Sequence, residues 1–324
     1  MAARTNIMSC MTSNSRGVLN LIWPRQTLEY ILEGHFIKEV LLAEIGRPIR
    51  TIVVERNAPF PLLDDALVVS FKSQLSGYLK EARLRGRSNI GLLHMADERG
   101  DEDLSFYECA DYVLRHYWFK HALVAPSKSL GVIWIPNGYR TGVGPISPQT
   151  LLTTAERDIM GFFSGVLHAH AQRDERQQMA RAIQDAKLPF ILNETPGFAQ
   201  GLGPVTYAAF LCRTRFGLVP GGNSPETIRL YEVLESGAIP VTLRSSFVNA
   251  PEALGTPPFM ILDQWSDLAA AYARYSDASA QGVVDEIERK RLAVYRWWTE
   301  FKVAQQLRIK NLINRSFVRA HGED

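Results

Sequence analysis

Residues 215–243, RFGLVPGGNSPETIRLYEVLESGAIPVTL, decide the fold expected of this chain. The apolar run at 216–219 is typical of a buried strand, and the Pro-Gly-Gly at 220–222 ends it in a loop. Glycines have no Cβ, so the backbone of such a loop can approach a ligand closely. A helical segment at 227–234 follows, and a second apolar run at 239–243 predicts another strand. Strand, helix and strand in this order predict an α/β fold with a parallel sheet.

The start of this helix carries the residues of a helix cap. Ser224 takes the N-cap position of the prediction, Pro225 the first helical position and Glu226 the first turn. Free backbone N–H groups and the helix dipole favour an anion at such an end, so the segment predicts a phosphate site. The same residues would equally cap a purely structural helix of an α/β fold.

Three polar residues favour a ligand site over a structural cap. Arg229 lies near enough to the helix start to hold a diphosphate, Glu232 can accept hydrogen bonds from ribose hydroxyls, and Asn223 adds an amide at the loop tip. The sequence contains no G-x-x-x-x-G-K-[ST], and no G-x-G-x-x-G opens its first half, which disfavours kinases, ATPases and dinucleotide dehydrogenases. The predicted donor-binding residues of this segment are Gly221, Gly222, Asn223, Ser224, Glu226, Thr227, Arg229 and Glu232.

The alternation of strands and helices continues on both sides of this segment. The thirteen residues at 136–148 hold three prolines and three glycines, which marks an interdomain loop. We therefore expect two Rossmann-like domains, 1–150 and 151–324, and a charged, aromatic C-terminal helical region from Val283 that packs back across the first half. The expected strands are 17–23, 50–55, 66–71, 90–94, 131–135, 160–167, 190–192, 216–219 and 239–243, with further helices at 27–44 and 173–185.

The composition excludes several other classes of protein. The chain has 324 residues with 36 Lys and Arg against 34 Asp and Glu, so it lacks the basic excess of a dedicated nucleic-acid binder. Its cysteines, Cys10, Cys109 and Cys212, are too few and too dispersed for a disulfide framework or a zinc site. Residues 1–20 have no apolar core of a secretory signal, and no run of ~18 apolar residues occurs. We therefore expect a cytoplasmic protein without a transmembrane segment.

The stretch at 216–241, FGLVPGGNSPETIRLYEVLESGAIPV, resembles the C-terminal signature of exostosin-like glycosyltransferases, S-x-x-x-x-R-L-x-E-x-L-x-x-G-x-I-P-V after a strand and a P-R-G loop. MGFFSG at 160–165, followed by Arg173 and Arg176, is similar to the start of the donor domain in that family. NIGLLHMADE at 89–98, followed by YVLRHYW at 112–118, is similar to the ribitol xylosyltransferase branch. The chain departs from the family at Gly222-Asn223, where an arginine or an acidic residue is frequent, so the donor nucleotide and sugar stay open.

This resemblance implies a GT-B architecture, in which two Rossmann-like domains face each other across a cleft. The first domain then holds a glycan acceptor and the second a nucleotide-sugar donor. The family inverts the anomeric centre, usually without the D-x-D metal site of other glycosyltransferases, so no metal or other cofactor is expected. One D-x-D sequence occurs, Asp101-Glu102-Asp103, but it lies in a polar loop. We interpret it as a solvent-exposed surface segment.

An inverting transfer needs a general base for the acceptor hydroxyl and positive groups for the departing diphosphate. The base is expected at the C-terminal end of a parallel strand of the first domain. Glu98 or Asp97 is the first choice and His94 the next, because all three follow the apolar strand residues at 90–93. The departing diphosphate is assigned to Ser224, Thr227 and Arg229, with Arg173 or Arg176.

The sequence thus predicts an inverting glycosyltransferase of polysaccharide biosynthesis that uses a nucleoside diphosphate sugar, most simply a UDP-sugar. Two other functions stay open at this point. One is a nucleotide-sugar-modifying enzyme, such as an epimerase, on a similar scaffold, which would need no acceptor. The other is an inactive subunit that binds a nucleotide sugar without turnover.

Overall fold

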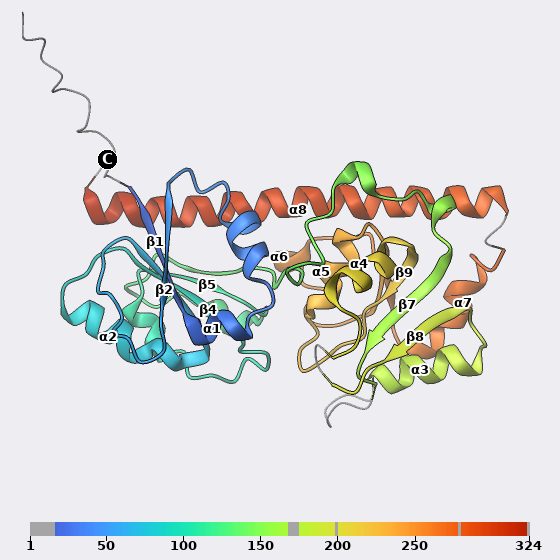
Figure 1. Cartoon of the computed structure of the whole chain (residues 1–324), viewed down its shortest axis with the longest axis horizontal. Coiled ribbons are helices and arrows are strands. Elements are labelled where there is room, and N and C mark those ends of the chain that lie inside the picture. The colour runs from blue at the N-terminus through green and yellow to red at the C-terminus, as the bar shows by residue number, and fades with distance from the viewer. Residues whose placement is uncertain (1–16, 168–174, 198–199, 278–279, 323–324) are drawn as a thin grey trace, which may run out of the picture.

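The computed structural model describes residues 17–167, 175–197, 200–277 and 280–322, which form two α/β lobes (Figure 1). The first lobe has a six-stranded sheet in the order β2-β1-β3-β4-β5-β6, and all neighbouring strands are parallel. Strands β1 and β4 are buried along their whole length, as expected of apolar runs covered on both faces. The strands are β1 (Leu19–Pro24), β2 (Ile49–Val54), β3 (Ala66–Phe71), β4 (Ile90–Met95), β5 (Tyr112–Arg115) and β6 (Val132–Trp134).

The second lobe has a five-stranded parallel sheet in the order β11-β10-β9-β7-β8. Its strands are β7 (Ile159–Gly165), β8 (Phe190–Glu194), β9 (Thr214–Leu218), β10 (Ile239–Leu243) and β11 (Met260–Leu262). Its helices are α3 (Glu175–Asp185), α4 (Pro204–Cys212), α5 (Ile228–Glu235), α6 (Pro251–Leu254) and α7 (Leu268–Ala273). Two parallel sheets with covering helices confirm the predicted fold class.

The prediction of a single helix at 27–44 is wrong. The first lobe instead has α1 (Arg25–Tyr30) and a separate π-helix, Phe36–Leu41, besides the later α2 (Ser76–Leu84). The helix stops because Ile31 is extended, with φ −86° and ψ 118°. Tertiary packing then decides the second piece: the Phe36 ring lies edge-on to Tyr139 at 4.9 Å and stacks on Trp298 at 6.1 Å.

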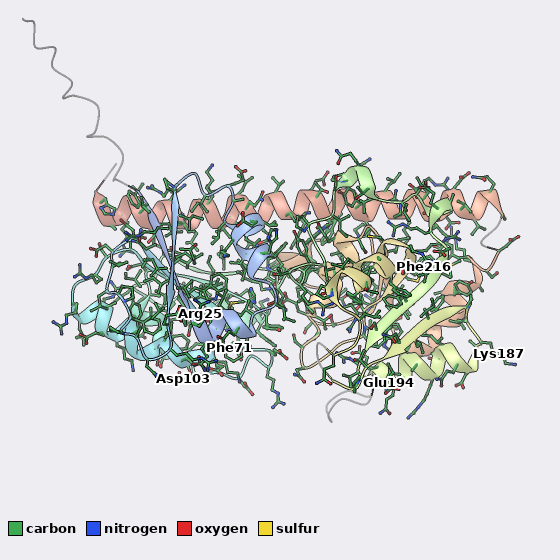
Figure 2. The ribbon with its side chains drawn as sticks, viewed as in Figure 1. Arg25, Phe71, Asp103, Lys187, Glu194 and Phe216 are labelled. Atoms are coloured by element: carbon green, nitrogen blue, oxygen red, sulfur yellow. The ribbon has the colours of Figure 1, made fainter. Side chains whose placement is uncertain are left out.

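The C-terminal helix, α8 (Gln281–His321), runs along both lobes (Figure 1). Its contacts with the first lobe include a bond from Gln306 Nε2 to the Val40 carbonyl at 2.9 Å. A second runs from Arg47 Nε to Asn314 Oδ1 at 2.8 Å. These contacts confirm that the C-terminal helix packs back across the first half. Figure 2 shows that α8 also carries many side chains that point away from the lobes.

One hydrophobic core extends through both lobes and α8. The Trp134 ring at the end of β6 lies 5.7 Å from Phe247 of the second lobe and 6.0 Å from Phe301 of α8. Aromatic side chains bury large apolar areas, so these contacts hold the two lobes together.

Candidate active site

The loop after β9 differs from its prediction in one respect that matters for the site. α5 begins at Ile228 with Thr227 as its N-cap, so Ser224 is not the cap and Pro225 and Glu226 precede the helix. The Ser224 hydroxyl instead accepts a hydrogen bond from the Glu226 N–H at 3.2 Å. The residues at 224–227 therefore belong to the loop, which is correspondingly longer than expected.

The reason for the late helix start is that the Glu226 carboxylate enters the first lobe. Its Oε2 accepts hydrogen bonds from the Trp118 backbone N–H at 2.9 Å and from Trp134 Nε1 at 3.0 Å. Its Oε1 accepts from the Asn137 backbone N–H at 3.2 Å and from the Tyr231 hydroxyl at 2.7 Å. Burial raises the pKa of this carboxyl to about 7, against these hydrogen bonds. Glu226 thus joins the lobes, and we remove it from the donor-binding set.

Two arginines of the second lobe meet beside this loop. Arg176, in the first turn of α3, donates from Nε to the Gly221 carbonyl at 3.1 Å and from Nη1 to the Val166 carbonyl at 3.0 Å. Arg229 Nη2 donates to the Ser164 carbonyl at 2.8 Å, and its guanidinium lies 4.5 Å above the Phe163 ring. Burial, together with the charge of Arg229, lowers the pKa of Arg176 to about 10.

Two hydrogen-bond donors of this cluster have no partner among the described residues. Among the described residues, the Thr227 hydroxyl and Arg229 Nε are buried and make no hydrogen bond. Two neighbouring guanidinium groups repel each other, and buried donors without acceptors cost free energy. This cluster, which we call the arginine pair, has the chemistry of a site for a phosphate or diphosphate. Arg173, which was expected to join it, lies outside the described residues.

The glycines of the loop have a steric role. The Gly221 N–H donates to Glu175 Oε2 at 2.8 Å, and a Cβ at Gly221 would collide with the same carboxylate. A Cβ at Gly222 would lie 3.2 Å from Arg176 Nη2, which is also tight. Neither position can carry a side chain without moving a charged group of the site.

A pocket of about 650 Å³ lies between the lobes, and Glu232 connects it with the arginine pair, because the charges of Arg140 and Arg229 both act on this carboxylate. Glu232, in α5, is buried at the boundary and pairs with Arg140 at 3.7 Å, and burial raises the pKa of its carboxyl. Arg140 itself lines the pocket. The other lining residues are Leu28, Ile31, Leu32, Gly34, His35, Lys38 and Glu39 from the first lobe, with Thr141, Gly201, Leu202, Gly203 and Pro204.

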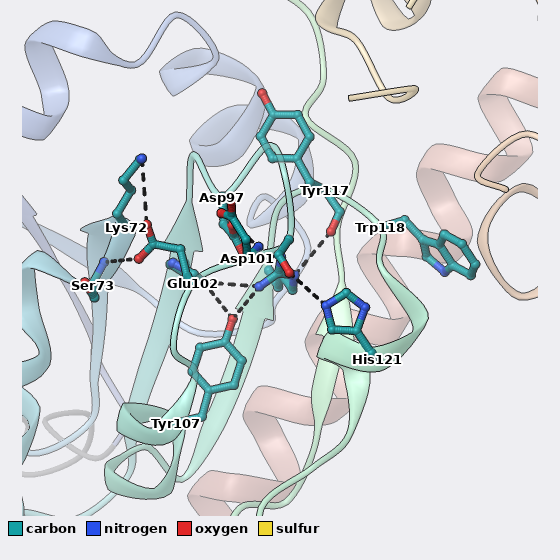
Figure 3. Close-up of polar contacts among 12 residues, drawn as sticks. Lys72, Ser73, Asp97, Asp101, Glu102, Tyr107, Tyr117, Trp118 and His121 are labelled. Carbon is teal, nitrogen blue, oxygen red and sulfur yellow. Dashed lines mark hydrogen bonds and ion pairs between the residues drawn. The ribbon is translucent and has the colours of Figure 1, made fainter. Parts of the chain in front are cut away.

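Two of the three candidate bases are enclosed in the first lobe. Asp97 is buried in an ion pair with Arg115 Nη2 at 2.6 Å. His94 Nδ1 shares a 2.6 Å hydrogen bond with the Tyr107 hydroxyl, and burial and the charge of Arg115 lower its pKa to about 3. Asp97 and Tyr107 both belong to the polar network drawn in Figure 3. Both candidates stabilise the sheet end rather than face the other lobe.

Glu98 is the candidate that reaches the second lobe. Its Oε2 accepts a hydrogen bond from Asn223 Nδ2 at 2.8 Å, and its Oε1 accepts from the Tyr117 hydroxyl at 3.3 Å. Asn223 is the exposed tip of the loop that carries the arginine pair. Glu98 therefore connects the end of β4 in the first lobe with the proposed phosphate loop in the second.

Glu33 is a second carboxylate at this boundary that the sequence analysis missed. It lies in the turn between α1 and the π-helix, between the pocket residues Leu32 and Gly34. Burial, together with the charges of Glu232 and Glu98, raises its pKa to about 7. The signal for it was weak, because a helix at 27–44 would have left Glu33 on a solvated face. Only Gly34, directly after it, hinted at a break.

The described residues include no group of three or more His, Cys, Asp or Glu side chains placed to hold a metal ion. The Asp101-Glu102-Asp103 segment has local partners. Glu102 accepts from the Ser73 N–H at 3.2 Å (Figure 3), and Asp103 accepts from the Ser105 N–H at 2.9 Å. Cys109 and Cys212 are free thiols. No helix in the described ranges is both long and apolar enough to cross a bilayer.

The arrangement of two such lobes is that of the GT-B glycosyltransferases. The chain is similar to the structure of a mutant O-GlcNAc transferase from Thermobaculum terrenum, with a TM-score of 0.52 and 12% identity over 94% of this chain and 68% of that one. A sucrose-phosphate synthase from Thermosynechococcus elongatus gives a TM-score of 0.49 and 11% identity, over 94% of this chain and 100% of that one.

The family model of the RXYLT1 C-terminal domain matches residues 145–318, more than half of the chain. The chain belongs to this exostosin-like family and is a glycosyltransferase. No curated protein sequence matches it.

Proposed function

We propose that this glycosyltransferase transfers a sugar, with inversion, from a nucleoside diphosphate sugar to a hydroxyl group of a glycan acceptor. The observation that supports this most is the position of the arginine pair. It lies at a glycine loop in the second lobe, while Glu33 and Glu98 lie across the boundary in the first. A cation site in one lobe and a carboxylate site in the other are what displacement of a diphosphate by a hydroxyl requires.

The donor diphosphate is assigned to the second lobe. Arg176 and Arg229 would form charge-assisted hydrogen bonds with its oxygens, and the Thr227 hydroxyl and the first N–H groups of α5 would donate to the same oxygens. Ser224, Gly221, Gly222 and Asn223 shape the loop around it. We keep UDP as the nucleotide, with the ribose near Glu232, since the charge of Arg229 acts on this carboxylate and Glu232 also pairs with the pocket residue Arg140.

The acceptor is assigned to the first lobe, with Glu33 as the general base. Both Glu98 oxygens already accept hydrogen bonds, whereas no described side chain donates one to Glu33. A base works best when its pKa is close to the working pH, and the pKa of Glu33, at about 7, meets this condition. Glu98 then keeps the Asn223 loop in place and maintains the negative charge that raises the pKa of Glu33.

The proposed reaction is one displacement. Glu33 takes the proton of the acceptor hydroxyl while its oxygen bonds to the anomeric carbon of the donor sugar. The bond from that carbon to the phosphate oxygen breaks, and the electron pair leaves with the nucleoside diphosphate, whose charge the arginine pair stabilises. Attack from the face opposite the leaving group inverts the anomeric configuration.

The test has two stages. A panel of UDP, GDP and CMP sugars is first screened by thermal shift, because a ligand of the folded state raises the melting temperature. The best donor is then used in hydrolysis and transfer assays, and the anomer formed is read by proton NMR. We expect the inverted anomer, and loss of turnover in R229A but not in R244A, an exposed arginine paired with Asp263. A product of retained configuration, or full turnover in R229A, would refute the proposal.

A further inference from the structure

The C-terminal half of α8 carries positive charge alone. Between Phe301 and His321 the sequence has five Lys and Arg residues and no Asp or Glu. Lys302 is accounted for, since its Nζ pairs with the buried Glu235 at 2.9 Å. Among the described residues no carboxylate pairs with the other four, Arg308, Lys310, Arg315 and Arg319.

Three of these arginines line a groove of about 870 Å³ between α8 and the edge strand β6. Arg308, Arg315 and Arg319 are exposed, and the one described partner of Arg308 is Gln305 Oε1 at 3.4 Å. The groove is lined by Ile133, Arg308, Asn311, Leu312, Asn314, Arg315, Val318 and Arg319. Arginines held together without counter-charges indicate an anionic ligand.

The C-terminal half of α8 also exposes apolar side chains. Val303 is 49% exposed and Leu307 is 51% exposed. Positions 303, 307, 311, 315 and 319 are exposed and follow one another at intervals of four, so they form one ridge that winds slowly around the outside of the helix into the groove. The ridge is about 24 Å long, from two aliphatic residues at one end to two arginines at the other. Exposed aliphatic residues beside exposed basic residues are typical of helices that lie on membrane surfaces.

We propose that this ridge and groove form a docking surface for an anionic phospholipid membrane. Phosphate groups of the lipid heads would enter the groove beside Arg308, Arg315 and Arg319, and Val303 and Leu307 would enter the interface. A soluble polyanion would explain the arginines but would leave the exposed aliphatic pair without a role. This proposal is independent of the donor and acceptor assignments above.

Vesicle co-sedimentation of the full chain tests the proposal. We expect binding to phosphatidylserine-rich vesicles, weak binding to pure phosphatidylcholine, and weakening as salt is raised. An arginine near an anionic surface contributes roughly fivefold to the binding constant, so R308Q/R315Q/R319Q should bind about a hundredfold more weakly. V303S/L307S should bind several-fold more weakly at unchanged charge.

The matched control is R289Q/R296Q/K187Q, which removes the same charge from exposed positions elsewhere. It should bind like the wild type, and circular dichroism should show all variants folded. Equal binding of both triple variants would overturn the proposal. So would a wild-type chain that is stabilised by inorganic phosphate or a soluble acidic glycan but does not sediment with anionic vesicles.

Discussion

Replacing Glu226 by alanine should destabilise the whole molecule, because this carboxylate is a hydrogen-bonded link between the lobes. Four donors would lose their acceptor: the backbone N–H groups of Trp118 and Asn137, Trp134 Nε1 and the Tyr231 hydroxyl. At about 1 kcal/mol for each buried hydrogen bond, the loss is about 4 kcal/mol. This is a large share of the 5–15 kcal/mol typical of folded domains.

Glutamine at this position separates hydrogen bonding from size. Its oxygen can still accept from Trp118 and Trp134, and the Tyr231 hydroxyl can rotate to accept from the new amide. The Asn137 N–H then faces a donor, which costs about 1–3 kcal/mol. E226Q should therefore lie between the wild type and E226A.

Urea unfolding followed by tryptophan fluorescence measures both variants. E252A is the control, because Glu252 is exposed and makes only a loose pair with Lys120, at 3.7 Å, and it should change the unfolding free energy by less than about 1 kcal/mol. If E226A matches the control, the carboxylate does not hold the lobes together, and Glu226 becomes available again as a donor ligand.

Three further predictions concern the pocket and the sheet end. The kcat/KM of the wild type should rise as the pH passes about 7, because Glu33 then loses its proton. The kcat/KM of E33Q should be low and independent of pH over this range. A wild-type profile without this rise would refute the role of Glu33 as the base. N223A removes the 2.8 Å hydrogen bond to Glu98, so the KM for the donor should rise. The unfolding free energy should change by less than about 1 kcal/mol. An unchanged KM would contradict the role of the Asn223–Glu98 hydrogen bond in holding the loop. R115M leaves Asp97 buried and without its ion-pair partner, so the free energy of unfolding in urea should fall by about 3–5 kcal/mol. A fall of less than about 1 kcal/mol would contradict the importance of this ion pair.

The strands were predictable where local sequence and burial agree. The runs at 66–71 and 239–243 coincide with β3 and β10, because continuous β-branched and apolar residues fit strands covered on both faces. β5 and β11 were missed, since they have four and three residues, and too short a run shows no period.

The helix starts and the site residues depended on contacts that the sequence does not display. A 3.6-residue apolar period at 27–44 was real, yet Phe36 packs against Trp298, more than 250 positions away, and the helix breaks. Glu226 had the position of a first-turn acid, but its four partners include three in the first lobe. The same tertiary contacts place Glu33 between two residues of the pocket wall, Leu32 and Gly34. Local patterns could predict the loop and its arginines, but not which carboxylates face them.

Arg176 and Arg229 are assigned to a nucleoside diphosphate, and calorimetric titration of UDP tests this assignment most directly. Hydrogen bonds to charged groups contribute about 1.5–3 kcal/mol each, so R176A/R229A should bind UDP at least about a hundredfold more weakly than the wild type. R244A should bind it like the wild type. Equal affinity of the double variant and the wild type would contradict the assignment of the diphosphate site.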